Sequence, residues 1–123
     1  MRSLTGLAAP MLAVIPLNAL HADPLPFRDG VYLSQPELCG LSISEMTNRI
    51  GDEVHYIYQE IDGVVFRGAE ALCDIDDVSI SGDRVRFQAS CDMEGTINRE
   101  TIELVYVSDS AFQSGGTVFQ RCG

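Results

Sequence analysis

The sequence predicts a mainly β fold: a small antiparallel up-and-down barrel or rolled sheet of about seven strands, with one short helix and two disulfides. Two observations lead to this prediction. Turn signals that contain glycine separate short runs of strand-forming residues along most of the chain. The four cysteines are an even number, which is typical of a disulfide-braced exported domain.

Residues 1–22 are predicted to be a signal peptide. Arg2 precedes an apolar stretch from Leu7 to Leu17, and small residues follow up to Ala22. Two prolines and an asparagine interrupt this region, and a membrane span needs about 20 consecutive apolar residues. We therefore expect a periplasmic or secreted protein without a membrane span, in which residues 23–123 form one domain.

The first predicted elements are a strand and a helix. Gly30 introduces the strand formers Val31 to Leu33. Ser42 and Glu45 have the spacing of a capping box, and Gly51 is placed to end the helix that follows. The apolar residues on one face of this helix are Ile43, Met46 and Ile50.

The next segment predicts a β-hairpin around the dipeptide Asp62-Gly63, a signal for a type I′ turn. The first strand of this hairpin would include His55, Tyr56 and Tyr58. A two-residue turn at this dipeptide places Ile61 opposite Val64 and Gln59 opposite Phe66.

Two further turns predict a continuous three-stranded ribbon. Gly82-Asp83 suits a type II′ turn, and Glu94-Gly95 marks the next reversal. Together they predict one apolar face that runs across all three strands. Its expected pairs are Ile80 with Val85, Val78 with Phe87, Phe87 with Ile102, and Val85 with Leu104. Residues 108–116 are expected to be a loop that ends at Gly115-Gly116 and leads into the last strand.

The cysteines are expected to form disulfides at one end of the molecule. If the strands alternate in direction, Cys39, Cys73, Cys91 and Cys122 all fall at that end. Of the three possible connectivities, the first choice is Cys39–Cys73 with Cys91–Cys122, each worth roughly 3–4 kcal/mol. The spacings match no CxxC pattern, so structural zinc is not expected.

Acidic residues in the stretch CDIDDVSISGDRVRFQASCDMEG are candidate metal ligands. Convergent carboxylates are what Ca²⁺ requires. The pattern of a calcium loop is not met, however, and aspartate is also a common turn residue. We therefore expect turns with an acidic rim and no cofactor, with Ca²⁺ as the alternative. The candidate ligands are Asp74, Asp76, Asp77, Asp92 and Glu94.

Catalytic residues are not evident, and the chain is not expected to be an enzyme. His55 is the one histidine after residue 22, and a lone strand histidine is rarely a general base. No serine lies in a nucleophile turn, and bridged cysteines leave no thiol nucleophile.

The net charge of −10 constrains the partners. It disfavours nucleic acid, whose phosphates repel an acidic surface, and it suits a basic envelope protein. Tyrosine and arginine are frequent interface anchors. The partner-binding candidates of these types are Tyr56, Tyr58, Arg67, Arg84 and Arg86.

The frame GVYLSQPELC … ASCDMEG … FQRC resembles small exported proteins of Gram-negative bacteria with four cysteines and a β fold. A disulfide-braced barrel that begins with G-x-W/Y is also distantly similar to calycin-type proteins, including the periplasmic lysozyme inhibitors. The S-G-x-x-Y loop of those inhibitors is absent, because Ser81-Gly82-Asp83 lies in a predicted hairpin instead.

These observations favour a non-catalytic periplasmic binding or inhibitor-like module. The alternatives are an envelope structural or stress-related protein without a specific ligand, and a calcium-dependent module.

Overall fold

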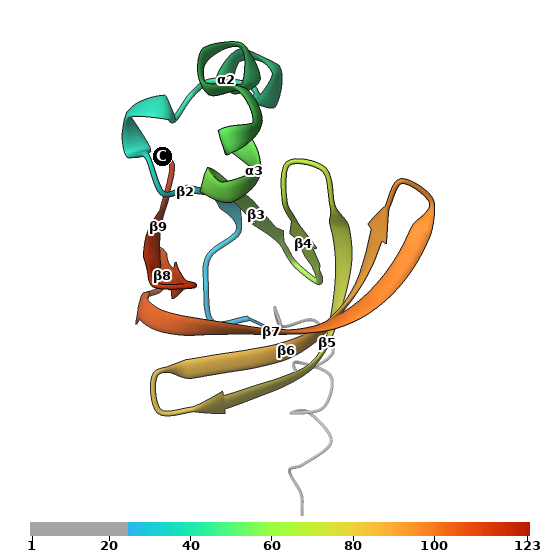
Figure 1. Cartoon of the computed structure of the whole chain (residues 1–123). Coiled ribbons are helices and arrows are strands. Elements are labelled where there is room, and N and C mark those ends of the chain that lie inside the picture. The colour runs from blue at the N-terminus through green and yellow to red at the C-terminus, as the bar shows by residue number, and fades with distance from the viewer. Residues whose placement is uncertain (1–24) are drawn as a thin grey trace, which may run out of the picture.

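The computed structural model describes residues 25–123, so the predicted signal peptide lies outside the described residues. The described chain forms a closed antiparallel barrel of eight strands with a group of short helices at one end (Figure 1). Each strand pairs with its neighbour in sequence, and β9 pairs with β2. The strands are β2 (Gly30–Leu33), β3 (Tyr58–Asp62), β4 (Val65–Arg67), β5 (Leu72–Ser81), β6 (Arg84–Met93), β7 (Thr96–Ser108), β8 (Ala111–Ser114) and β9 (Thr117–Arg121). The mainly β prediction is confirmed, with one strand more than expected.

The additional strand is β8, in the segment that was expected to be a loop. It forms a hairpin with β9 in which Ser114 lies opposite Thr117, so the Gly115-Gly116 turn is confirmed. Phe112 of β8 is fully buried, and its ring centroid lies 5.0 Å from that of Tyr32 and 5.6 Å from that of Phe119. Burial of this ring is what makes the short segment a strand.

The barrel closes where β2 meets β9, with Tyr32 opposite Arg121. Arg121 lies across Gly30, where a Cβ atom would be only 2.7 Å from the arginine Nε. That Nε donates a hydrogen bond to the carbonyl of Asp29 at 2.6 Å. The Tyr32 hydroxyl donates to the carbonyl oxygens of Arg28 and Asp109. Residues of the G-x-Y and R-C segments therefore meet at the closure.

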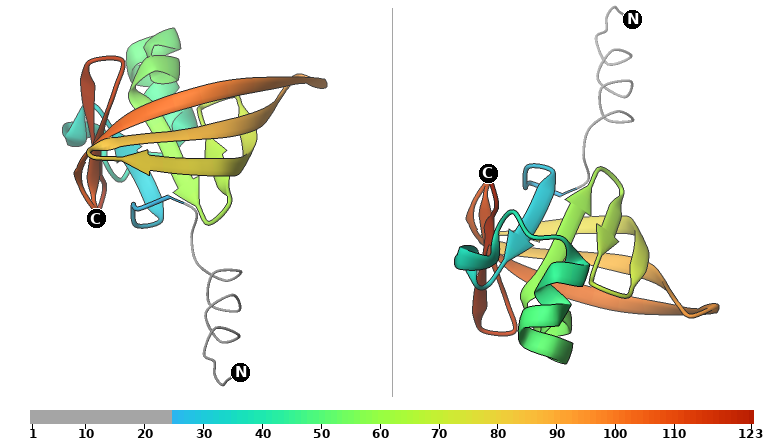
Figure 2. Two further views of the ribbon diagram at one scale, coloured as in Figure 1. Left: turned by 90° about the horizontal axis from the view of Figure 1, so that it is seen from below. Right: turned by 90° about the horizontal axis from the view of Figure 1, so that it is seen from above.

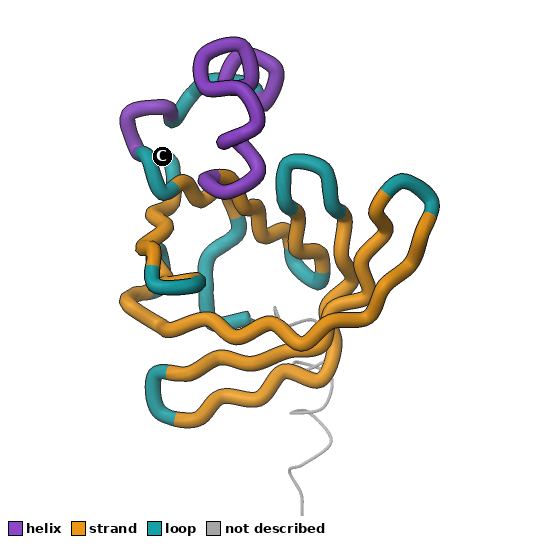
Figure 3. The backbone as a smooth tube through the Cα atoms, in the orientation of Figure 1, coloured by secondary structure: helices purple, strands orange, loops and turns teal. Residues whose placement is uncertain are grey.

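Four short helices, which we call the helical cap, cover one end of the barrel (Figure 3). The predicted helix is confirmed as α2 (Ile43–Ile50). The Ser42 hydroxyl accepts from the Glu45 amide at 3.1 Å, and the Glu45 carboxylate accepts from the Ser42 amide at 2.8 Å. Gly51 ends the helix with a φ of 65°. The other cap helices are η1 (Pro36–Leu38), η2 (Gly51–Glu53) and α3 (Val54–Ile57).

Helix α3 corrects the prediction of a strand around His55 and Tyr56. Val54 and Ile57 are buried while the two residues between them are exposed, which is helical spacing. The cap and the outer face of β2 and β3 share a second core, in which Leu33 and Tyr58 contact the cap. The segment is helical because it covers this core.

The β3–β4 hairpin turns one residue later than predicted. Its turn is Gly63-Val64, and Ile61 lies opposite Phe66 rather than Val64. A shift of the register by two keeps every side chain on its original face. It pairs two buried residues, leaves Val64 exposed, and lets the Asp29 carboxylate accept from the Gly63 amide at 3.0 Å.

The ribbon of β5, β6 and β7 has the predicted turns. Ile80 lies opposite Val85, and on the other side Val85 lies opposite Leu104 and Phe87 opposite Ile102. A bulge between Asp76 and Ser79 in β5 breaks the predicted pair of Val78 with Phe87.

The predicted disulfide connectivity is wrong. The bridges are Cys39–Cys122 and Cys73–Cys91. The β5 bulge places Cys73 directly opposite Cys91, where a regular ladder would have offered Asp92 instead. The expectation that all four cysteines share one end rested on a count of seven strands, whereas β8 makes β9 antiparallel to β2. Cys122 still packs with Cys39 against the core beneath the cap, and its amide donates to the Val31 carbonyl at 2.7 Å.

Side chains fill the barrel interior. One buried cluster receives residues from all eight strands, and its aromatic members on the strands are Tyr32, Phe66, Phe87, Phe112 and Phe119. The Phe66 and Phe87 ring centroids lie 5.5 Å apart in an edge-to-face arrangement. Because side chains occupy the interior, a binding site is expected on the outer surface or at the boundary between the barrel and the cap.

Candidate functional site

A cleft of about 520 Å³ lies between the helical cap and the barrel. Its walls come from the start of α2, the end of β4, the β4–β5 loop and the β6–β7 turn. The β4–β5 loop, with the sequence Gly-Ala-Glu-Ala, has small side chains that leave this space open. The lining residues are Ile43, Glu60, Arg67, Gly68, Ala69, Glu70, Ala71, Leu72, Asp92, Glu94 and Gly95.

A short polar chain lies at the barrel side of the cleft. The Tyr58 hydroxyl donates to Glu60 Oε1 at 2.8 Å, and Arg67 Nε lies 4.0 Å from the same oxygen. Burial, with the hydrogen bond to Glu60, raises the pKa of Tyr58 to about 12, so this phenol stays a neutral donor at physiological pH. Arg67 and Glu60 face each other across β4 and β3. The pairing of β3 with β4 therefore keeps Arg67, the one arginine in the lining, beside the Glu60 carboxylate.

The rim of the cleft carries the remaining carboxylates. Asp92 Oδ1 accepts from the Gly95 amide at 3.0 Å and so braces the β6–β7 turn. Glu70 is largely exposed, and its Oε1 lies 3.8 Å from His55 Nε2. Glu94 lies in the turn with a φ of 56°. Because four carboxylates face a single arginine, the cleft has a negative potential.

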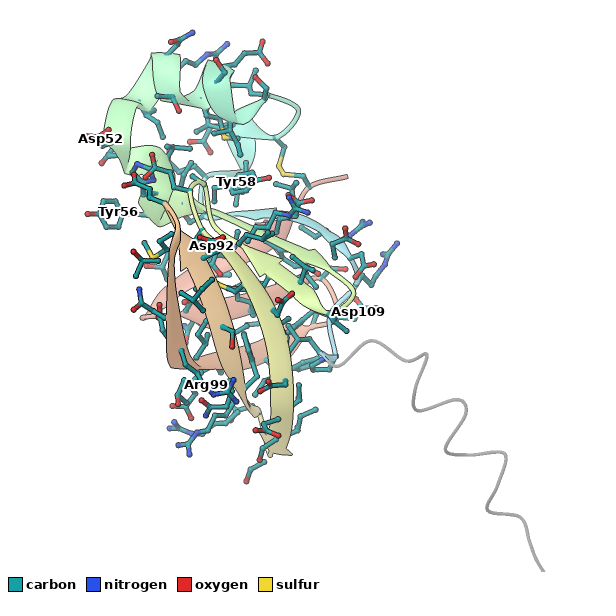
Figure 4. The ribbon with its side chains drawn as sticks, turned by 90° about the vertical axis from the view of Figure 1, so that its right-hand side faces the viewer. Asp52, Tyr56, Tyr58, Asp92, Arg99 and Asp109 are labelled. Carbon is teal, nitrogen blue, oxygen red and sulfur yellow. A yellow bond between two sulfur atoms is a disulfide. The ribbon has the colours of Figure 1, made fainter. Side chains whose placement is uncertain are left out.

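The structure divides the partner-binding candidates between two regions. Arg67 lines the cleft, and Tyr56 is 78% exposed on the neighbouring helix α3. Tyr58 was expected to be available at the surface, but it is buried between barrel and cap, and only its hydroxyl reaches Glu60 (Figure 4). This burial follows from the second core beneath the cap.

Arg84 and Arg86 lie at the opposite end of β6 from the cleft. Arg84 Nη1 donates to Glu103 Oε2 at 3.2 Å, and both arginines line a shallow depression of about 270 Å³ with Ser79 and Ser81. These five partner candidates do not form one surface. The two arginines of β6 and the cleft are separate sites.

The candidate calcium ligands are not gathered into a metal site. Arg99 binds Asp76 in a bidentate ion pair, with nitrogen–oxygen distances of 2.9 and 3.3 Å, and lies 3.6 Å from Asp77. Arg99 lies opposite Ser90 in the ladder of β6 and β7, so this ion pair occupies the outer face of the ribbon beside Asp92. Within residues 25–123, no group of three or more His, Cys, Asp or Glu side chains is arranged to hold a metal ion.

Nucleophilic side chains are absent from the lining of the cleft, which holds no serine, threonine or cysteine. His55 is outside the lining of the cleft, and its Nε2 lies 3.8 Å from Glu70 Oε1 on the rim. Across residues 25–123, every cysteine is in a disulfide. The cleft can therefore offer charge and hydrogen bonds to a bound group.

Sequence reasoning missed Glu60 and Glu70 as members of the site. Glu60 shares a face of β3 with Tyr58, and the small-residue loop around Glu70 was a visible gap between two strand signals. What could not be read from the sequence was the cap, which closes the second side of the cleft.

Comparisons with known proteins found no match: no family model, no curated protein and no solved structure matches the chain. Within the described residues, no helix has the length and apolar character needed to cross a membrane.

Proposed function

We propose that the protein is a non-catalytic periplasmic binding or inhibitor-like module whose acidic cleft receives a basic group of a partner protein. The cleft between cap and barrel is the observation that carries this proposal. The packed barrel interior supports a site at the surface rather than a ligand enclosed by strands. The two disulfides support a protein that works outside the cytoplasm.

The charge of the cleft supports a basic partner in particular. Glu70 and Glu94 are exposed on the rim and make no hydrogen bond that the fold needs. A lysine or arginine side chain entering between them would meet carboxylates on both sides and the Glu60 oxygens below. The overall charge of −10 would speed its approach.

The proposal is tested by reversing the charge of the rim. The variant Glu70→Lys/Glu94→Lys should lose a stoichiometric basic partner that the unmodified protein retains from an envelope extract, and the purified pair should show the same loss. Glu37→Lys/Asp52→Lys makes the same change in net charge on exposed cap residues outside the cleft, and it should keep the partner. Equal retention by both variants would contradict the cleft as the site.

The alternative function is an envelope structural or stress-related protein without a specific ligand. If this alternative is correct, the same experiment finds no protein that binds in stoichiometric amount and is lost in Glu70→Lys/Glu94→Lys. A calcium-dependent module is the third candidate, and the bidentate pairing of Asp76 with Arg99 weighs against it.

A further inference from the structure

Strand β7 has a long free edge. It is paired with β6 from Thr96 to Val105, but β8 pairs with it only from Val105 onward. Figure 2 shows the β6–β7 hairpin projecting beyond the rest of the barrel, with β7 on the outside. Within the described chain, the stretch from Thr96 to Leu104 therefore has a strand on one side only.

The backbone groups on this edge can be assigned from the ladder. The Tyr106 amide donates to the Asp83 carbonyl on the β6 side. Backbone groups alternate in direction along a strand, and the ladder with β6 is regular up to Thr96. The amides and carbonyls of Ile97, Arg99, Thr101 and Glu103 therefore point away from β6, toward the free edge.

Strand β5 also has a free edge, beyond its short pairing with β4, but that edge is blunted. It carries the bulge at Asp77, and a bulge on an edge strand prevents pairing with another strand. The edge of β7 contains no bulge, proline or glycine between Thr96 and Leu104, and Ile97 is 65% exposed on it. Of the two edges, only that of β7 is shaped to accept a strand.

We propose that the free edge of β7 pairs with the same edge of a second copy of this chain, forming a symmetric antiparallel dimer. A two-fold axis between antiparallel strands is perpendicular to the sheet and places one residue opposite itself. An axis at Arg99 or at Glu100 would set like charges against each other. An axis at Thr101 places threonine opposite threonine and Arg99 opposite the partner's Glu103, with the free backbone groups of all three facing the partner.

This register is self-complementary in charge. Arg99 and Glu103 point to the same outer face, and the pair of Arg99 with the partner's Glu103 would occur twice in the dimer, once on each side of the axis. The negative net charge opposes association, so the dimer is to be measured at physiological ionic strength, where the screening length is about 8 Å.

The first test removes a single edge donor. In Thr101→Pro the lost amide points to the free edge, so no backbone hydrogen bond of the barrel is removed, whereas the centre of the dimer loses its hydrogen-bonded pair. Thr101→Val is the control: it loses the same hydrogen bond from Gln88 to the threonine hydroxyl but keeps the amide. Sedimentation over a concentration series should give dimer for the unmodified protein and Thr101→Val, and monomer for Thr101→Pro.

The second test exchanges the charges. Arg99→Glu and Glu103→Arg each place like charges opposite each other and should each be monomeric, while an equimolar mixture should form a heterodimer. Because both variants also lose an ion pair within the chain, the melting temperature of each is measured alone, and recovery in the mixture isolates the contact between copies. A monomer at every concentration, or a dimer indifferent to these substitutions, would overturn the proposal.

Discussion

At the scale of single residues, Gly30 shows how a short motif closes the barrel. The backbone at Gly30 has a φ of 147°, and Arg121 lies across it to reach the Asp29 carbonyl. A side chain at position 30 would occupy the space of the arginine. Gly30 of the G-x-Y segment and Arg121 of the R-C segment are therefore in direct contact, although they lie near opposite ends of the domain's sequence.

We expect Gly30→Ala to lower the free energy of unfolding by more than Gly40→Ala, by about 1 kcal/mol or more. Both glycines have a positive φ, so both variants carry backbone strain. Only at position 30 must a neighbour move, because nothing lies within 4 Å of a Cβ at position 40. Displacement of Arg121 breaks its hydrogen bond to Asp29. Urea denaturation of the two variants measures the difference, and equal losses would contradict this account of the closure.

At the scale of elements, the bulge in β5 decides which residues face each other. Asp77 has a φ of 52°, a left-handed conformation that is unfavourable for most side chains. One extra residue on β5 shifts the ladder so that Cys73 lies opposite Cys91. A single unusual backbone position therefore determines a disulfide.

We predict that Asp77→Val is less stable than Asp77→Gly by about 1–2 kcal/mol. Both variants lose the same exposed contact with Arg99, which contributes little, so their difference does not depend on that ion pair. Thermal unfolding followed by circular dichroism provides the comparison. If the two variants melt together, Asp77 does not adopt the bulge conformation in solution.

Elements with local signals were predictable, and elements that depend on distant burial were not. The turns at Gly82-Asp83 and Glu94-Gly95 and the capping box of Ser42 depend on neighbouring residues, and all were located correctly. Helix α3 depends on a core beneath the cap, and β8 depends on the burial of Phe112. The bulge at Asp77 has no pattern that distinguishes it from an ordinary strand residue.

In the candidate site too, residue types were predictable from the sequence, whereas contacts between distant segments were not. Arg67 could be named from its residue type, but its cleft exists only because the cap, the β4–β5 loop and the β6–β7 turn meet. Tyr58 was named as a partner-binding candidate from its residue type, but both faces of β3 are covered in the barrel and Tyr58 is buried.

At the scale of the whole molecule, the two disulfides have different reach. Cys73–Cys91 links adjacent strands across 18 residues, while Cys39–Cys122 links the cap to the last strand across 83. In the chain-entropy model, these loops correspond to about 3.2 and about 4.6 kcal/mol of stabilisation. The longer bridge is also the covalent link between the cap, which forms one wall of the cleft, and the strand that closes the barrel.

We expect peptide mapping of the purified protein without reduction to recover these two linkages and to find no free thiol. We also expect Cys39→Ala/Cys122→Ala to lose more free energy of unfolding than Cys73→Ala/Cys91→Ala, by about 1.4 kcal/mol, because the longer loop restrains the unfolded chain more. Cys73 and Cys91 are buried, so their removal also costs packing and narrows the difference. Denaturation of both double variants under the same conditions tests the order, and a reversed order would mean that core packing outweighs the restraint of the unfolded chain.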